Sequence, residues 1–230
     1  MLYLVEGNIG TGKSTFLKLL QKSLAQAEIV FEDVNYWQQK IEGTSILQNF
    51  YQDPVRWAYT METLALKMRV KQHIAHQNAT HPVFIERSIY SGYHCFAMNS
   101  FKQGFLSSVE WNIYQQWFEF TTQQQCKKPD GIIYLQADAQ VSFERTLQRN
   151  RNAEAGIPLS YLTQIHKTHE QFLISKETMH SSLHDVPVLT INCNQDFTTE
   201  KNWQELQDQV FPFITLANSS AINVANSLTL

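Results

Sequence analysis

A glycine-rich stretch near the start of the chain constrains its fold more than any other feature. Residues 7–15 read Gly-Asn-Ile-Gly-Thr-Gly-Lys-Ser-Thr, which fits the pattern of Gly, four free positions, Gly, Lys and then Ser or Thr. Apolar residues of strand length precede it, and residues 14–25 after it predict an amphipathic helix. Because the motif requires this context, the stretch indicates a loop that binds the phosphates of a nucleoside triphosphate, rather than an ordinary glycine-rich turn.

Each residue type in this loop has a chemical role. Gly7, Gly10 and Gly12 let backbone N–H groups turn towards phosphate oxygens, and the helix that follows presents its positive N-terminus to the same anion. Lys13 is predicted to reach the β- and γ-phosphates of ATP, and the Ser14 hydroxyl to bind Mg²⁺. The rest of the predicted ATP-binding loop consists of Asn8, Ile9, Thr11 and Thr15.

The composition excludes several classes of protein. With 230 residues, 43% of them hydrophobic and 17% charged, the chain can bury a sizeable core. Its net charge of −3 argues against a general nucleic-acid binder, which needs a basic surface. No apolar run reaches the length of a membrane span, and the chain opens directly with a predicted strand. Three scattered cysteines favour a reducing compartment, so we expect a cytoplasmic protein.

Strands and helices alternate along the chain. Beyond the first strand, further strands are predicted at residues 28–31, 82–85, 132–136 and 188–193. Helices are predicted at residues 14–25, 46–78 with a break near Pro54, 90–100, 107–124, 139–149, 159–180 and 203–216. This order predicts an α/β fold of the P-loop NTPase type: a three-layer sandwich with a parallel sheet of about five strands, flanked by helices and an arginine-rich lid. We expect one domain over residues 1–216 and a flexible tail over 217–230.

Ligands of parallel sheets bind beyond the carboxyl ends of the strands. That rule gathers Glu32, Glu86, the phosphate loop and the loop after Cys193 around one crevice. A carboxylate at position 86 could accept a proton from a hydroxyl group, or hold Mg²⁺ through water. Arg87 could neutralise charge that develops on a transferred phosphoryl group. The pair Glu86-Arg87 is therefore predicted to be catalytic together with Lys13.

Three arginines gather between residues 145 and 151. Arg145 and Arg149 are four residues apart on one helix face, and Arg151 follows in the adjoining loop. Such a cluster is usually a solvated surface. Beside a phosphate loop it favours a lid that closes over the polyphosphate and excludes water.

Several motifs, in order and with matched spacing over residues 2–214, resemble the deoxynucleoside kinase family. They are the phosphate loop, Glu-Arg-Ser-Ile-Tyr-Ser at 86–91, Asp-Gly-Ile-Ile-Tyr-Leu-Gln at 130–136 and Arg-Asn-Arg-Asn-Ala-Glu-Ala-Gly-Ile-Pro-Leu-Ser-Tyr-Leu at 149–162. The resemblance implies ATP- and Mg²⁺-dependent phosphorylation of a deoxynucleoside at its 5′-hydroxyl, in nucleoside salvage. It also implies a homodimer.

The resemblance assigns roles around the transferred phosphoryl group and the sugar. Glu86 is then the general base that takes the 5′-hydroxyl proton, while Arg87 and Glu32 orient that hydroxyl and the γ-phosphate. Tyr51 and the lid residue Glu154 hold the 3′-hydroxyl. Tyr51 also crowds the position of a 2′-hydroxyl, which favours deoxyribose over ribose.

Two further sets of contacts follow from the resemblance. The ATP-binding set adds Arg145, Arg149, Arg151 and, in the loop that contacts the donor adenine, Asp196 and Phe197. The base pocket is lined by Trp37, Leu47, Phe50 and Phe96. The alternative for these four large residues is ordinary core packing.

Two positions depart from the family pattern. Glu62 stands where the family has a glutamine that pairs with the base, and Gly92 stands where deoxycytidine and deoxyguanosine kinases have an aspartate. The arginine partner of that aspartate remains as Arg69. An ionised Glu62 accepts hydrogen bonds and donates none, which suits the N1–H and 2-amino groups of guanine, with Arg69 donating to O6.

We therefore hypothesise a purine substrate, with deoxyguanosine favoured, since Gly92 also vacates volume for a purine. In the alternative, Glu62 pairs with Arg69 and merely replaces the missing aspartate. A pyrimidine or broad-specificity deoxynucleoside kinase is also open, as is a nucleoside monophosphate kinase, although those enzymes usually have Asp-Arg-Tyr where this chain has Glu-Arg-Ser. A non-catalytic P-loop interaction protein is less compatible with the intact Lys13 and Ser14.

Overall fold

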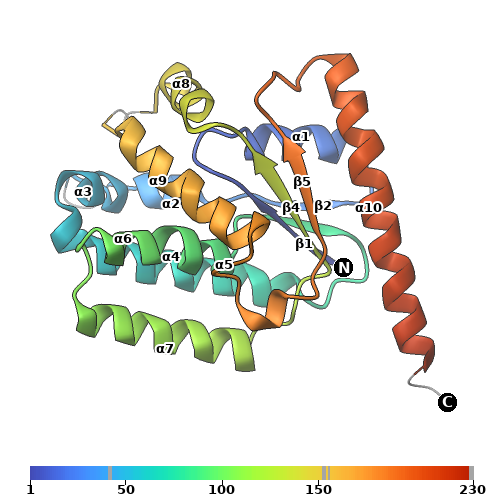
Figure 1. Ribbon diagram of the computed structural model, residues 1–230, viewed down its shortest axis with the longest axis horizontal. Coiled ribbons are helices and arrows are strands. Elements are labelled where there is room, and N and C mark those ends of the chain that lie inside the picture. Colours follow the sequence, from blue (N-terminus) through green and yellow to red (C-terminus); the bar gives the residue numbers. More distant parts are fainter. Residues whose placement is uncertain (41–42, 152–153, 155, 228–230) are drawn as a thin grey trace.

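A five-stranded parallel sheet in the order β2-β3-β1-β4-β5 forms the centre of the molecule (Figure 1). The structure is a computed structural model that describes residues 1–40, 43–151, 154 and 156–227, with residues 35 and 216–227 described by their backbone alone. The strands are β1 (Leu2–Glu6), β2 (Glu28–Val30), β3 (Val83–Glu86), β4 (Gly131–Gln136) and β5 (Val188–Asn192). The predicted α/β fold is confirmed.

The central strand β1 shows why the sheet is covered on both faces. All of its residues are buried, as expected for a parallel strand between two helical layers. Leu2 and Leu4 pack into one core cluster, whereas Tyr3 and Val5 pack into the other. This alternation follows from the period of two residues along a strand. The sequence of β1 therefore specifies a three-layer arrangement.

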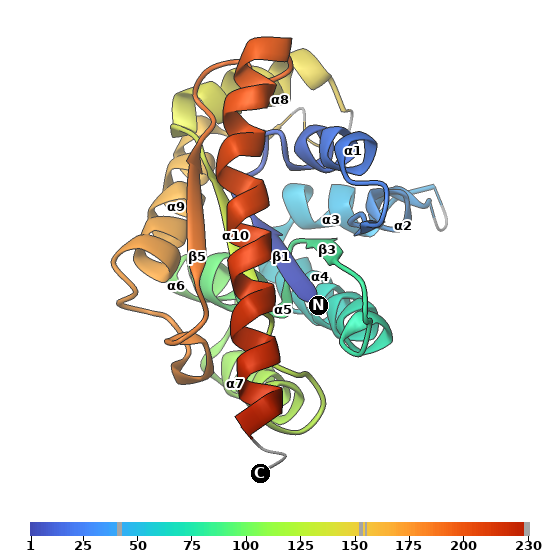
Figure 2. The same ribbon diagram turned by 90° about the vertical axis from the view of Figure 1, so that its right-hand side faces the viewer.

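The helices divide between the two faces of the sheet. They are α1 (Lys13–Ser23), α2 (Val34–Gln38), α3 (Ile46–Gln52), α4 (Pro54–His76), α5 (Ile89–Ser91), α6 (Met98–Lys102), α7 (Ser108–Gln124), α8 (Ala139–Arg149), α9 (Leu159–His169) and α10 (Glu200–Ser227). Residues of α1 and α10 bury the face that carries Tyr3, and α10 lies in front of the strands in Figure 2. Residues of α4, α5 and α7 bury the opposite face. In the part of the chain that the structure describes, no helix has the length and apolar character that a membrane span requires.

The expected helix 90–100 is interrupted. The structure has α5, then a π-helical segment at Gly92–Ala97, and then α6. The Ser88 side chain caps α5 by accepting from the backbone of Tyr90 and Ser91, so the helix begins directly after β3. A π-helical turn changes the direction of side chains relative to a regular helix. Periodicity alone did not predict it.

Three other boundaries differ from the sequence prediction. A short helix, α2, begins within the stretch expected to be irregular, because the Asp33 side chain accepts a hydrogen bond from the backbone N–H of Tyr36. The expected helix 159–180 ends early, after a π-helical segment at Glu170–Ile174. The last helix was expected to end near residue 216 but continues to Ser227, and residues 213–227 contain no glycine or proline that would end a helix.

Candidate active site

The phosphate loop joins β1 to α1 and is tightly enclosed by its neighbours. Gly10 and Gly12 have φ angles of 86° and 96°, in the left-handed region that favours glycine. A Cβ atom at Gly10 would lie 2.2 Å from the carbonyl oxygen of Ser142 on α8, and one at Gly12 would lie 2.7 Å from the Phe197 ring. The loop therefore needs glycine both for its backbone conformation and for the close approach of α8 and the loop after β5.

The polar side chains of the loop have two functions. Asn8 Nδ2 donates to the carbonyl of Leu162 at 2.8 Å, and Thr11 Oγ1 donates to the carbonyl of Asn8 at 3.2 Å, so both side chains fix the shape of the loop. Lys13 Nζ donates to the carbonyls of Gly7 and Asn8 at 3.2 and 2.6 Å. The lysine also lines the adjoining cavity, where it can meet a phosphate.

Lys13 is a nearly buried cation. The residue is 5% exposed. Burial, and then the nearby positive charge of Arg87, lower the pKa of the Lys13 ammonium to about 7. A phosphate bound beside it would favour the charged form.

Glu86, the last residue of β3, contacts Ser14, which follows Lys13 at the start of α1. The Ser14 hydroxyl donates to its two carboxylate oxygens at 2.9 and 3.1 Å. A hydroxyl and a carboxylate in contact are oxygen ligands of the kind that Mg²⁺ prefers. These two predicted metal-binding residues therefore lie together and fit a magnesium ion.

Two arginines hold Glu32 at the centre of the site. Arg69 Nη2 donates to Glu32 Oε1 at 2.9 Å, and Arg87 Nε donates to Glu32 Oε2 at 3.2 Å. Burial alone would raise the pKa of Glu32, but the guanidinium groups of Arg87 and Arg69 hold it below its usual value. Arg87 also donates from Nη1 to the carbonyl of Gly7 at 3.0 Å, which connects Glu32 to the phosphate loop.

Arg87 has an unusual backbone conformation. Its φ angle is 63°, a backbone conformation that residues other than glycine rarely adopt. The residue is 4% exposed. Such strain persists only where the surroundings impose it, and it is common at functional sites. Here the sharp turn after β3 points the guanidinium back under the phosphate loop and over the Phe96 ring, with 4.7 Å from Cζ to the ring centroid.

The three predicted lid arginines do not act alike. Arg149 Nη2 pairs with Glu154 Oε2, and Arg151 Nη1 pairs with Glu154 Oε1 at 3.3 Å, above the cavity. Arg145 instead donates from Nη1 and Nη2 to backbone carbonyls of residues 193–195, the shortest contact being 2.7 Å to Cys193. It therefore fixes the loop that carries Asp196 and Phe197.

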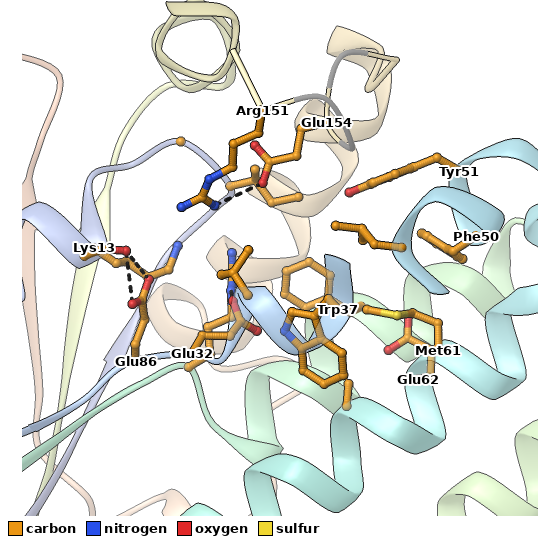
Figure 3. Close-up of a pocket in the computed structure, with 18 of the residues that line it drawn as sticks. Lys13, Glu32, Trp37, Phe50, Tyr51, Met61, Glu62, Glu86, Arg151 and Glu154 are labelled. Carbon is orange, nitrogen blue, oxygen red and sulfur yellow. Dashed lines mark hydrogen bonds and ion pairs between the residues drawn. The ribbon is translucent and has the colours of Figure 1, made fainter. Parts of the chain in front are cut away.

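One cavity extends from the phosphate loop to the middle of α4, at Met61 and Glu62. Figure 3 shows Lys13 and Glu86 at one end, Glu62 and Met61 at the other, and Glu32 and Trp37 between them. Nearly all of the predicted substrate-binding residues line it: Glu32, Trp37, Leu47, Phe50, Tyr51, Glu62, Arg69, Arg87, Phe96 and Glu154. Tyr51 points its hydroxyl towards the cavity from α3, and burial, followed by the charge of Glu154, raises its pKa.

Gly92 is the predicted substrate-binding residue that does not line this cavity. A Cβ atom there would lie 2.6 Å from Arg69 Nη1, so the space that an aspartate would need is next to the Arg69 guanidinium. Among the ion pairs of the described residues, Arg69 pairs with Glu32 and not with Glu62. Glu62 instead accepts a hydrogen bond from the Ser100 hydroxyl at 3.1 Å. The predicted alternative of a direct Glu62–Arg69 ion pair is not observed.

Several residues that line this cavity and an adjoining one were not predicted from the sequence. Val34, Met61, Ala65 and Tyr161 line the cavity that holds Glu62, and Lys18, Gln148 and Thr198 line the adjoining one beyond the phosphate loop. Val34 was missed because α2 was not predicted. Tyr161 lies within the motif at 149–162, which was the one available signal for it.

Comparison with known proteins agrees with this geometry. The chain matches the family model for deoxynucleoside kinases over residues 3–215. It is 36% identical to a deoxycytidine kinase of Homo sapiens, with 92% of this chain and 90% of that protein covered. It is 35% identical to a mitochondrial deoxyguanosine kinase of Xenopus laevis, with 91% and 88% covered. It is 37% identical to deoxycytidine kinase 2 of Gallus gallus, with 92% and 89% covered. This chain belongs to the deoxynucleoside kinase family.

Proposed function

We propose that the protein transfers the γ-phosphoryl group of ATP to the 5′-hydroxyl of a deoxynucleoside, as a step of nucleoside salvage. The observation that supports this most directly is the single cavity that runs from Lys13 and Glu86 to Glu62. One end offers cations and backbone amides to phosphates, and the other is lined by aromatic side chains and ends in a buried hydrogen-bonding group. A nucleoside bound with its base at the aromatic end would direct its 5′-hydroxyl towards the end that binds phosphates.

The phosphate end would bind ATP through the loop amides, Lys13, Arg149 and Arg151. Ser14 and Glu86 would hold Mg²⁺, which neutralises charge on the phosphate oxygens when it is bound. Phe197 packs against Gly12, and together with Asp196 it lines the adjoining cavity, where the rest of the donor nucleotide would lie. Phosphoryl transfer needs positioning and charge neutralisation more than covalent chemistry, and this end supplies both.

Either of two carboxylates could accept the proton of the 5′-hydroxyl. Glu86 is the general base that the sequence predicts, but its contact with Ser14 also favours a role at the metal ion. Glu32 lies nearer to the base pocket, and its lowered pKa makes it a weaker proton acceptor than an ordinary carboxylate. We retain Glu86 as the proposed general base, with Glu32 as the alternative.

We further propose that purines, and deoxyguanosine above all, are the preferred acceptors. Glu62 can accept hydrogen bonds from N1–H and the 2-amino group of guanine. Arg69 keeps Nε and Nη1 without a hydrogen-bond partner in the described part of the chain, so it has donors available for O6. A pyrimidine or broad-specificity kinase and a nucleoside monophosphate kinase are the alternatives.

The decisive experiment is a substrate panel with ATP and Mg²⁺. ADP release is measured with deoxyguanosine, deoxyadenosine, deoxycytidine, thymidine and the corresponding monophosphates. We expect release with free nucleosides and the highest kcat/KM for deoxyguanosine. Activity confined to monophosphates would assign a different kinase, and a clear preference for pyrimidines would reject the guanine proposal while leaving the kinase intact. No release with any acceptor would favour a non-catalytic protein.

A homodimer is proposed from the outer face of α7. Val109, Ile113, Trp117 and Phe120 recur at helical spacing there and are 69%, 39%, 53% and 41% exposed. Large apolar residues gathered on one helix face mark an interaction surface, and α7 lies at the outer edge of the molecule in Figure 1. We expect Trp117→Glu to convert the dimer into a monomer in light scattering, whereas the matched change Glu119→Gln leaves the mass unchanged. A monomeric wild type would reject the proposal.

A cytoplasmic location is also proposed. Cys95, Cys126 and Cys193 are all buried and free. Thiols of this kind persist in reducing compartments. Imaging of a fluorescently tagged chain is the test, and a mitochondrial signal would reject the proposal.

A further inference from the structure

Glu62 is a buried carboxyl group with one oxygen that is free to bind a ligand. It lies on α4 at the closed end of the cavity and is only 4% exposed. Oε1 accepts the hydrogen bond from Ser100 on α6. Among the described residues, Oε2 has no hydrogen-bond partner. A base that enters the cavity would therefore meet Oε2 directly and could share Oε1 with Ser100, since each oxygen has two lone pairs.

The groups around Glu62 leave its charge only partly compensated. Arg69 on α4 is the nearby cation, but its guanidinium is already paired with Glu32 at 2.9 Å. Tyr114 on α7 and Tyr161 on α9 also face Glu62, and burial raises the pKa of both phenols, so they stay neutral. Burial raises the pKa of Glu62 to about 7, with Arg69 and the Ser100 hydroxyl opposing the rise.

The two protonation states of Glu62 present different hydrogen-bonding edges. The carboxylate accepts two hydrogen bonds, whereas the neutral acid accepts one at its carbonyl and donates one from its hydroxyl. Guanine offers two adjacent donors, N1–H and the 2-amino group. Adenine offers one donor, the 6-amino group, beside one acceptor, N1. Each state of Glu62 therefore complements one purine and leaves an unpaired group against the other.

We propose, resting on the kinase function proposed above, that Glu62 binds guanine as a carboxylate and adenine as a neutral acid, so that pH selects between the two purine deoxynucleosides. At alkaline pH the enzyme favours deoxyguanosine, and acidification shifts it towards deoxyadenosine. Glu62 is thus a specificity-determining residue that works in two states.

The test is the ratio of kcat/KM for deoxyguanosine to kcat/KM for deoxyadenosine, measured across pH. Both substrates use the same phosphate end, so a change in the ionisation of Lys13 or Glu32 affects both alike and cancels in the ratio. The ratio then follows the proportion of ionised to neutral Glu62, which changes about tenfold for each pH unit whatever its pKa. We expect a rise of about 100-fold between pH 6 and pH 8.

Two variants sharpen this test. Glu62→Gln cannot ionise and keeps one donor and one acceptor, so its ratio should favour deoxyadenosine and stay flat with pH. Ser100→Ala removes a hydrogen bond that stabilises the carboxylate, so its ratio should fall several-fold at every pH while the slope with pH is retained. A flat ratio in the wild type, or the wild-type slope in Glu62→Gln, would overturn the inference.

A binding measurement provides a second readout that needs no variant and no turnover. Calorimetry in buffers of different ionisation enthalpy counts the protons exchanged on binding. Deoxyguanosine should release a proton when it binds near pH 6, and deoxyadenosine should take one up near pH 8. Binding of both nucleosides without proton exchange refutes the two-state inference alone, whereas failure of both to be phosphorylated refutes the kinase proposal.

Discussion

Each end of the cavity buries an ionisable group, Lys13 at one end and Glu62 at the other, and the comparison between them separates catalysis from specificity. Burial brings the pKa of Lys13 down to about 7 and the pKa of Glu62 up to about 7, so the charged and neutral forms of both groups coexist near physiological pH. A bound phosphate is negatively charged and favours the ammonium form of Lys13, so binding fixes the protonation state of this lysine. A nucleobase is uncharged, so Glu62 keeps both states available. Changes at the phosphate end should therefore affect all nucleosides equally, and changes at the base end should affect their ratio.

The largest expected effect comes from removing the cation at the phosphate end. Lys13→Met keeps the length of the side chain but loses its charge, so kcat/KM should fall roughly 10³-fold for every nucleoside. The deoxyguanosine to deoxyadenosine ratio should stay unchanged. Lys22→Met, at an exposed position near the end of α1, is the matched control and should retain activity. A fall in kcat/KM for only one of the nucleosides would show that catalysis and base specificity are not separated between the two ends.

The next largest effect is expected from replacing the two carboxylates near the transferred phosphoryl group, Glu86 and Glu32. Glu86→Gln should lower kcat by roughly 10²- to 10³-fold for all nucleosides and raise the Mg²⁺ concentration required. Glu32→Gln should cost less, on the order of tenfold, if Glu86 accepts the proton. Steady-state rates of both variants and the wild type, measured at several Mg²⁺ concentrations, test this order. The reverse order of effects would identify Glu32 as the proton acceptor and leave Glu86 to the metal ion.

A smaller effect is expected from the neighbour of Arg69 at the base end. Gly92→Asp would place a carboxylate beside the Arg69 guanidinium, since an added Cβ atom would lie 2.6 Å from Arg69 Nη1 and the end of that side chain would have to shift. This contact would occupy the donor proposed for guanine O6, so the deoxyguanosine to deoxyadenosine ratio should fall about tenfold. Gly92→Ala adds volume without charge and should lower the ratio less. If the deoxyguanosine to deoxyadenosine ratio is the same in both variants and in the wild type, Arg69 does not take part in base recognition.

The smallest effect concerns stability. The pKa of Glu62 in the folded protein, about 7, lies above its usual value of 4.5, so between these pH values the folded protein retains a proton that the unfolded chain has lost. Stability from this group therefore falls as pH rises through that window. Glu62→Gln should be more stable than the wild type by roughly 1–3 kcal/mol at pH 8, and by much less at pH 5. Urea unfolding measures this difference, with the exposed Glu177→Gln as the control that shows no such pH dependence.

Sequence patterns predicted the phosphate end more completely than the base end. Gly12, Lys13 and Ser14 are consecutive, so one local motif specifies their chemistry. Glu62, Trp37 and Phe96 come from different elements, and only packing brings them to one cavity. Met61 was missed because nothing in a single sequence distinguishes a large apolar residue that lines a pocket from one in the core.

The sequence alone determined the α/β architecture, the phosphate loop and the strand ends that carry Glu32 and Glu86, because these depend on local periodicity and on the geometry of parallel sheets. The tertiary structure decided which groups meet. It paired Arg69 with Glu32 rather than Glu62, tied Arg145 to the loop after β5, and interrupted the helix that follows Ser88. Hydrogen bonding and desolvation act between residues far apart in the chain, so no local pattern specifies them.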